Sequence, residues 1–147
     1  MNFLRYESPE NNVKYPNTWE KGDAKTFVAP PPFVVVFAIP VERPPALYRE
    51  FVGISITSND TNSIEQLMEQ RIASIRKLNF EILESSLSTL VGMPAYQIVY
   101  IENGVKILAV VTTKGNKAFA IMYFSRPEKY QEYLSTVEQM ITSFEFI

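Results

Sequence analysis

Apolar and polar positions alternate along three consecutive stretches in the second half of the chain, and this period of two predicts three adjacent strands. Tight turns separate them at Asn103-Gly104 and at Gly115-Asn116, because these dipeptides accept the backbone angles of short hairpins. The alternating sets are Tyr96, Ile98 and Tyr100, then Ile107, Ala109 and Val111, then Phe119, Ile121 and Tyr123. The opposite faces are also mostly apolar, so this sheet needs cover on both sides.

Further strands are predicted upstream of these three. They comprise two short strands within 3–21 around a turn at 9–12, the apolar run 33–39, the segment 51–60 and the segment 80–90. Pro16 should end the second short strand, because proline cannot donate a ladder hydrogen bond. Gly92 and Pro94 mark the place where the chain reverses out of 80–90, since glycine permits a bend and proline is tolerated at a strand's first residue.

Two amphipathic helices are predicted from apolar residues that recur at three- and four-residue steps. Each begins with the spacing of a capping box, Ser63 with Gln66 and Ser125 with Glu128. The apolar stripes are Ile64, Leu67, Met68, Ile72, Ile75 and Leu78 in the first helix, and Tyr130, Tyr133, Leu134, Val137, Met140, Ile141 and Phe144 in the second. Consecutive hairpins with covering helices predict an α+β fold. Its antiparallel sheet core is flanked by helices as an α/β/α sandwich, in one domain spanning 1–147.

The composition removes several classes of function. The 147 residues include no cysteine and no histidine, which excludes disulfides, thiolate sites and the usual proton shuttle near neutral pH. The formal net charge is −2 and no block of like charge occurs, so nucleic acid is not expected as a partner. No apolar run approaches the roughly 20 residues that a membrane span needs, and the N-terminus lacks the apolar stretch of a signal peptide.

Polar residues near the start of the first helix raise the question of a calcium site. Asp60, Glu65 and Glu69 could contribute oxygens, but calcium takes about six to eight of them and the EF-hand spacing is absent. We interpret Asp60 as a turn residue and the two glutamates as surface charges near a helix start. The segment 114–117, KGNK, could bind an anion at its glycine, but a strand follows instead of a helix, which favours a plain hairpin turn.

Catalysis finds little support in the sequence. Without histidine, a serine–lysine pair is the remaining route to a serine nucleophile. No motif brings Ser86 or Ser88 next to Lys106 or Lys117. We therefore predict that the protein is not an enzyme and has no catalytic residue, no metal ligand and no cofactor.

Aromatic residues are frequent and could form a base-stacking platform. The series Tyr96, Tyr100, Phe119 and Tyr123 is placed at steps of two along predicted strands. We interpret these residues as cross-strand pairs in the core, because the even charge balance offers no electrostatic support for a nucleic acid.

The proline-rich segment 40–50 is the predicted partner-binding site. Pro44 and Pro45 restrict its backbone, which lowers the entropy lost on binding. The segment carries Arg43, Leu47, Tyr48 and Arg49, and arginine and tyrosine are enriched among the residues that dominate interface energies. The alternative is a plain connector in which Leu47 and Tyr48 pack onto the core.

Three segments of the chain resemble the PsbP family. Residues 11–21, NNVKYPNTWEK, resemble the family's first strand, which ends in Tyr-Pro and is followed by a tryptophan. Residues 82–100 resemble its central hairpin, with Gly92, Pro94, Ala95 and Tyr96 in matching places, and residues 112–146 resemble its last strand, helix and tail. The family is similar in fold to a yeast nuclear-import factor that binds the small GTPase Ran, so the resemblance implies that fold for this chain.

The resemblance also implies a role. Photosynthetic members are extrinsic proteins on the lumenal side of photosystem II, where they help to retain calcium and chloride. This chain lacks the histidines implicated in metal contacts there and the long basic N-terminal arm, so only a non-enzymatic role in binding a protein partner or a membrane-bound complex is carried over. Similar domains elsewhere are often secreted or lipid-anchored, which implies an extracytoplasmic location with a leader absent from this sequence. We expect a monomer, and a domain that binds a small ligand or calcium in a pocket between sheet and helix stays open as the alternative.

Overall fold

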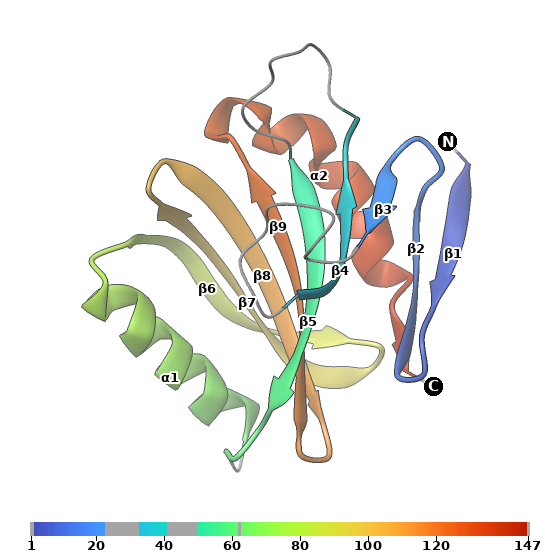
Figure 1. Cartoon of the computed structure of the whole chain (residues 1–147). Helices are drawn as coiled ribbons and strands as arrows, with labels where there is room; N and C mark the ends of the chain where they lie inside the picture. Colours follow the sequence, from blue (N-terminus) through green and yellow to red (C-terminus); the bar gives the residue numbers. More distant parts are fainter. Residues whose placement is uncertain (1, 23–32, 41–49, 62, 147) are drawn as a thin grey trace.

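The computed structural model describes residues 2–22, 33–40, 50–61 and 63–146. In chain order these ranges form β1 (Phe3–Glu7), β2 (Asn11–Pro16), β3 (Glu20–Gly22), β4 (Phe33–Ala38), β5 (Phe51–Ser58), α1 (Ile64–Lys77), β6 (Glu81–Leu90), β7 (Met93–Glu102), β8 (Val105–Lys114), β9 (Lys117–Ser125), α2 (Pro127–Thr142) and β10 (Glu145–Phe146). The α+β class and the antiparallel core are confirmed (Figure 1). The short strands β3 and β10 lie outside the predicted set, because two or three residues carry no readable periodicity.

The large sheet has the strand order β3-β4-β5-β9-β8-β7-β6, and every neighbouring pair within the described residues is antiparallel. The meander β6–β9 follows the predicted hairpins. β5, in contrast, pairs with β9 and not with β6, so the chain must cross the sheet to reach its far edge. α1 makes this crossing (Figure 1). A second, smaller sheet with the order β1-β2-β10 lies beside α2.

The two helices cover opposite faces of the large sheet (Figure 1). On the α2 face, a core forms from side chains that include Val13, Trp19, Phe37, Val52, Ile54, Val110, Phe119, Ile121, Tyr123, Val137, Met140 and Phe144. On the α1 face, a second core forms from side chains that include Phe33, Val36, Phe51, Ile64, Ile75, Tyr96, Ile98, Tyr100, Ile107, Val111 and Phe124. The sheet is therefore buried on both sides, as its apolar faces predict.

The register separates the aromatic residues that the sequence grouped together. All four are buried, so their assignment to the core is confirmed. The prediction that they form cross-strand pairs with one another is wrong. Tyr96 lies opposite Val111 on the α1 face, whereas Tyr123 lies opposite Leu108 on the α2 face. Phe119 shares the α2 face with Tyr123. Alternation divides the side chains of each strand between two faces, but it does not determine which face of the neighbouring strand lies on the same side of the sheet.

The helix starts follow the prediction in one case. The Ser63 hydroxyl accepts a hydrogen bond from the Gln66 amide at 3.1 Å and caps α1, as predicted. The predicted Ser125 cap of α2 is wrong, because Arg126 is the N-cap and the Ser125 hydroxyl donates to the Arg126 carbonyl oxygen. Pro127 explains the shift, since proline is favoured at the first helical position and fixes where the helix begins.

A fully buried carboxylate, that of Glu50, binds the N-cap residue of α2. The Glu50 side chain is 0% exposed and accepts three hydrogen bonds from Arg126, from the backbone amide at 3.1 Å, from Nε at 3.0 Å and from Nη2 at 2.9 Å. Burial raises the pKa of Glu50, but the hydrogen bonds and the charge of Arg126 outweigh it and hold that pKa below its ordinary value. This pair joins the chain just before β5 to the start of α2.

The turn between β6 and β7 answers why glycine and proline precede the central strand. Val91 and Gly92 form the two-residue turn, and both have positive φ, 54° and 71°. Pro94 is the second residue of β7, and its carbonyl oxygen accepts a hydrogen bond from the Thr112 hydroxyl at 2.8 Å. A β-branched residue at positive φ is strained, so this turn holds its shape against the preference of Val91.

Candidate functional site

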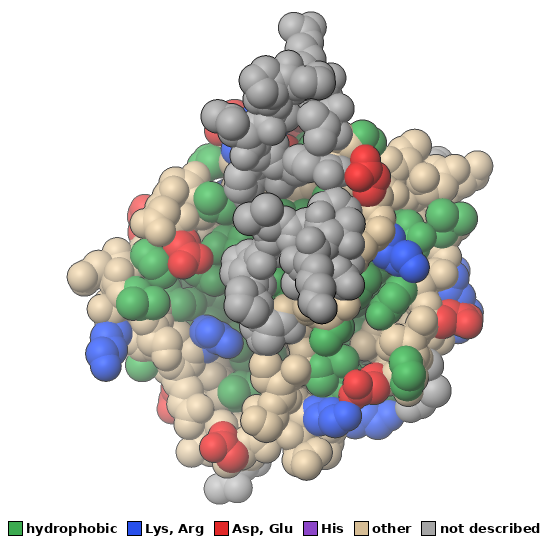
Figure 2. Space-filling view, viewed as in Figure 1, with side chains coloured by type: hydrophobic (Ala, Val, Ile, Leu, Met, Phe, Trp, Pro, Cys, Tyr) green, Lys and Arg blue, Asp and Glu red, His purple; other side chains and the backbone are tan. Residues whose placement is uncertain are grey.

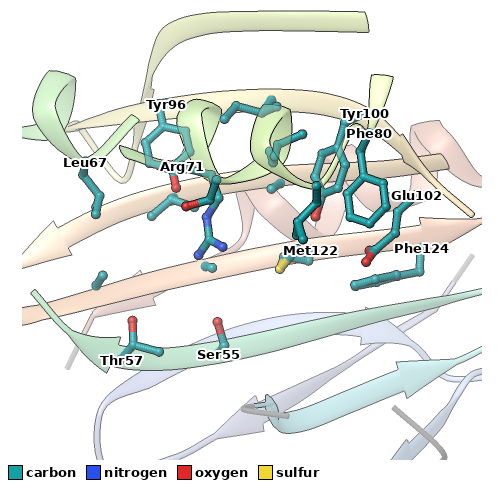
Figure 3. Close-up of a pocket in the computed structure, with 18 of the residues that line it drawn as sticks. Ser55, Thr57, Leu67, Arg71, Phe80, Tyr96, Tyr100, Glu102, Met122 and Phe124 are labelled. Atoms are coloured by element: carbon teal, nitrogen blue, oxygen red, sulfur yellow. The ribbon is translucent and has the colours of Figure 1, made fainter. Parts of the chain in front are cut away.

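Small side chains make a hollow on the α1 face of the large sheet. Ser55 of β5, Ala109 of β8, and Ala118 and Ala120 of β9 point toward α1 and leave space beneath the helix. A cavity of about 310 Å³ results, with a lining that is mostly apolar (Figure 3). Such a volume lies at the low end of the range of small-molecule sites, about 300–1,000 Å³. Hydrophobic side chains are visible on this face between α1 and the strands (Figure 2).

The helix wall of the cavity interrupts its own apolar stripe with a charge. Leu67, Arg71 and Ile75 stand at steps of four on α1, so they share one face of the helix, and all three line the cavity. Arg71 reaches from the helix toward the sheet, with the Tyr96 hydroxyl beside it (Figure 3). Leu78, the last residue of the predicted stripe, also lines the cavity but remains 63% exposed.

Arg71 enters the cavity without an acidic partner. Among the described residues, no carboxylate forms an ion pair with its guanidinium. Burial raises the pKa of Tyr96, and the charge of Arg71 and a hydrogen bond from it oppose this rise. Burial and the charge of Glu102 raise the pKa of Tyr100 to about 12, again opposed by Arg71. Both phenols are therefore protonated at neutral pH and can donate hydrogen bonds into the cavity.

The other end of the cavity is aromatic. Phe80, Phe124 and Glu102 lie there, away from Arg71 (Figure 3). The Phe33 ring packs edge-on against Phe124, with centroids 5.7 Å apart. Gly53 makes room for Phe33, because a Cβ at that position would lie 2.5 Å from the ring. The cavity thus has a cationic end at Arg71, an aromatic end that also carries the Glu102 carboxylate, and a floor of small side chains between them.

The site residues proposed from the sequence cannot be compared with this cavity. Arg43, Leu47, Tyr48 and Arg49 fall in 41–49, outside the described residues, so the binding role of that loop stays a prediction. Ile39 and Glu50 flank it, and the Ile39 amide donates to the Glu50 carbonyl oxygen at 3.1 Å.

The other candidates have structural places. Gly115 and Asn116 form a hairpin turn, as predicted. Lys106 lies over the Tyr130 ring, with Nζ 4.1 Å from its centroid, and Lys117 forms an ion pair with Glu10. In the part of the chain that the structure describes, no three His, Cys, Asp or Glu side chains gather as a metal site, and this includes Asp60, Glu65 and Glu69.

Sequence reasoning missed Arg71, although one signal points to it. An arginine that stands four residues from an apolar neighbour on each side, within an apolar stripe, must lie between a helix and its sheet or reach past the interface. The small residues of the floor gave no such signal, because Ala109 and Ala118 are as typical of a packed core as of a hollow one.

Comparison with known proteins places the fold. Neither a family model nor a curated protein matches the sequence. The solution structure of cyanobacterial PsbP from Synechocystis is similar over 99% of this chain and 92% of that chain, with a TM-score of 0.69 and 18% sequence identity. The chain has the PsbP-like fold.

Two further structures of similar fold come from other bacteria. LpqN, involved in cell envelope biogenesis of Mycobacterium tuberculosis, is 12% identical, with a TM-score of 0.64 over 99% of this chain and 89% of that chain. A protein of unknown function from Pseudomonas aeruginosa is 12% identical, with a TM-score of 0.61 over 97% of this chain and 96% of that chain. At these identities the likeness shows a shared PsbP-like fold. None of the described helices is both long enough and apolar enough to cross a membrane.

Proposed function

We propose that this domain binds a small amphipathic carboxylate in the cavity between α1 and the sheet. The observation that carries the proposal is Arg71, an exposed cation that lines a mostly apolar cavity and forms no ion pair with a carboxylate among the described residues. Arg71 is an exposed residue, so its charge stays in contact with water while its side chain lines the cavity, and its donors remain open to an anionic group that enters from solvent. This develops the ligand-binding alternative that the sequence left open.

The two ends of the cavity fit the two ends of such a ligand. The planar guanidinium of Arg71 can donate two parallel hydrogen bonds to a carboxylate, which is the strongest pairing available to this side chain. The protonated hydroxyls of Tyr96 and Tyr100 can add donors. The apolar body of the ligand would lie over Ala109, Ala118 and Ala120 and extend toward the aromatic end.

The test compares octanoate with octanol, which share a tail and differ in the carboxylate. We expect octanoate to bind and octanol to bind much more weakly in calorimetric titrations. Arg71→Gln should weaken octanoate binding by about 10- to 100-fold, since a hydrogen bond to a charged group contributes about 1.5–3 kcal/mol. Arg76→Gln is the matched control, because Arg76 lies on the same helix and does not line the cavity. Equal affinity for the two ligands, or for wild type and Arg71→Gln, contradicts the proposal.

We propose a non-enzymatic role, which the absence of histidine and cysteine supports. Among the described residues that line the cavity, Glu102 is the one carboxylate and no lysine is present, so this lining offers no serine–lysine pair. A hydrolase screen on ester and phosphate substrates tests this, and reproducible turnover that Arg71→Gln abolishes would contradict it.

An extracytoplasmic location is part of the proposal. Its support is the PsbP-like fold shared with LpqN, which is involved in cell envelope biogenesis. Cell fractionation of the full-length gene product tests the location, and recovery in the cytoplasmic fraction alone contradicts it.

A further inference from the structure

β6 forms one edge of the large sheet and is exposed along most of its length. Its hydrogen-bonded neighbour is β7, and its other side has no partner strand among the described residues. Leu83 and Leu87 are 47% and 52% exposed on β6, and Val91 and Met93 are exposed at its turn. A long edge strand that carries exposed apolar side chains is a template for pairing with another strand.

The features that usually protect an edge strand are mostly missing from β6. The strand contains no lysine, arginine or proline, and its bulge lies near one end, between Ile82 and Glu84. From Glu84 to Leu90 the pairing with β7 is regular, and the run from Ser85 to Leu90 carries no charge. A second strand could therefore add along this run.

The backbone groups available to a second strand follow from the turn. Leu90 and Met93 close the two-residue turn as a hydrogen-bonded pair. Antiparallel pairs alternate, so the amides and carbonyls of Thr89, Leu87 and Ser85 point away from β7 toward the open side. These three residues can exchange hydrogen bonds with an added strand without disturbing the β6–β7 ladder.

Recesses flank β6 on both faces of the sheet. On the α1 face, a recess of about 260 Å³ lies between the start of α1 and the β6–β7 turn, and its lining includes Leu87 and Glu65. On the α2 face, a groove of about 610 Å³ runs beside α2, and its lining includes Leu83, Glu84 and Glu138. An added strand would place alternate side chains in the two recesses, which is how sheet-edge peptide recognition obtains specificity.

The charge of the two recesses distinguishes between the possible partners of the β6 edge. Glu65, Glu84 and Glu138 give the recesses an acidic character, and the one lysine among their lining residues, Lys106, lies over the Tyr130 ring. A second copy of the chain would present a β6 whose charged residues, Glu81 and Glu84, are also acidic, so that strand offers no lysine or arginine to the acidic recesses. An extended segment with lysine or arginine between apolar residues complements this edge.

We infer that β6 is a docking edge for an extended basic–apolar segment of a partner protein, which adds to the sheet as an antiparallel or parallel strand beside Ser85, Leu87 and Thr89. This inference is independent of the carboxylate site, which lies under α1. It assigns a surface for the partner-binding role that the resemblance implies, at a place other than the loop 41–49.

The test uses a synthetic peptide of alternating valine and lysine, with a valine–glutamate peptide as the charge control. We expect the lysine peptide to bind at least about tenfold more tightly than the glutamate peptide. Binding should protect the amides of Ser85, Leu87 and Thr89 from hydrogen exchange. Ser85→Pro removes an outward donor and should abolish binding, whereas Ser85→Ala keeps that donor and should bind like wild type.

Several outcomes would overturn the inference. Equal affinity for the two peptides, unchanged binding by Ser85→Pro, or no binding by the lysine peptide would each do so. Sedimentation of the protein alone tests for self-association through β6. A dimer that Ser85→Pro dissociates would assign the edge to a second copy of the chain and overturn the inference. Circular dichroism and thermal unfolding of Ser85→Pro show whether this variant is folded, without reference to the carboxylate site.

Discussion

The buried pair of Glu50 and Arg126 gives a quantitative test of what fixes α2 to the sheet. Glu50→Gln keeps the shape of the side chain, removes its charge and places an amide donor opposite the Arg126 donors. Glu50 is fully buried, but the Arg126 side chain is 38% exposed, so water can reach the freed guanidinium. The loss should therefore lie near the lower end of the range for breaking a buried pair, about 3 kcal/mol.

Thermal unfolding followed by circular dichroism measures this loss. For a domain of this size 1 kcal/mol corresponds to about 2–4 °C, so Glu50→Gln should lower Tm by about 6–12 °C at pH 7. Glu132→Gln is the matched control, since it breaks the exposed 3.2 Å ion pair with Lys129 and should change stability by less than about 1 kcal/mol. Equal Tm values for the two variants would refute the reasoning.

The pH dependence of the same pair has a definite sign. The pKa of Glu50 is lowered in the folded state, so its contribution is complete above the unfolded pKa of about 4.3. It is lost as the pH falls through the folded pKa. The Tm difference between wild type and Glu50→Gln should therefore be constant from pH 7 to pH 5 and shrink below about pH 4. A difference that grows on acidification contradicts this.

Three further predictions concern the turn and the α1 face. Val91→Asn should stabilise the protein by about 1 kcal/mol, because asparagine tolerates positive φ, and Asn103→Val at the equivalent turn should destabilise it by a similar amount. Chemical denaturation measures the change in the free energy of unfolding for each variant, and changes of the same sign in both would contradict the prediction. Gly53→Ala should cost about 1–3 kcal/mol through the clash with Phe33, and Phe33→Leu in the same chain should restore part of it; additive losses would be the wrong result. Ala120→Leu should fill the cavity and abolish octanoate binding without lowering Tm, and retained binding would place octanoate elsewhere.

The meander could be predicted because its local signals agree. Asn103-Gly104 and Gly115-Asn116 mark turns, and alternation between them defines strands, so both kinds of evidence specify the same hairpins. The Ser63 cap was equally readable, since its partner lies three residues away. Local chemistry therefore predicts local structure well.

The rest depends on contacts between distant residues. Glu50 follows Arg49 directly in the sequence, and nothing there points to its actual partner, Arg126, which is 76 positions away. The register of β8 with its two neighbours decides which side chains of β9 share a face with which side chains of β7. Because both faces of the sheet are apolar, the hydrophobic pattern does not specify this register. The cavity under α1 depends on this register, because its floor combines residues of β5, β8 and β9 that share a face only when the strands pair in this way.

Intermolecular nuclear Overhauser effects in the octanoate complex test the central claim most directly. We predict contacts from the octanoate methylenes to the methyl groups of Ala109, Ala118 and Ala120, with the largest carboxylate-dependent shift at the Arg71 guanidinium. Contacts confined to the exposed side chains of β6, or a complex whose Arg71 signals match those of the free protein, would contradict the assignment of this cavity as the binding site.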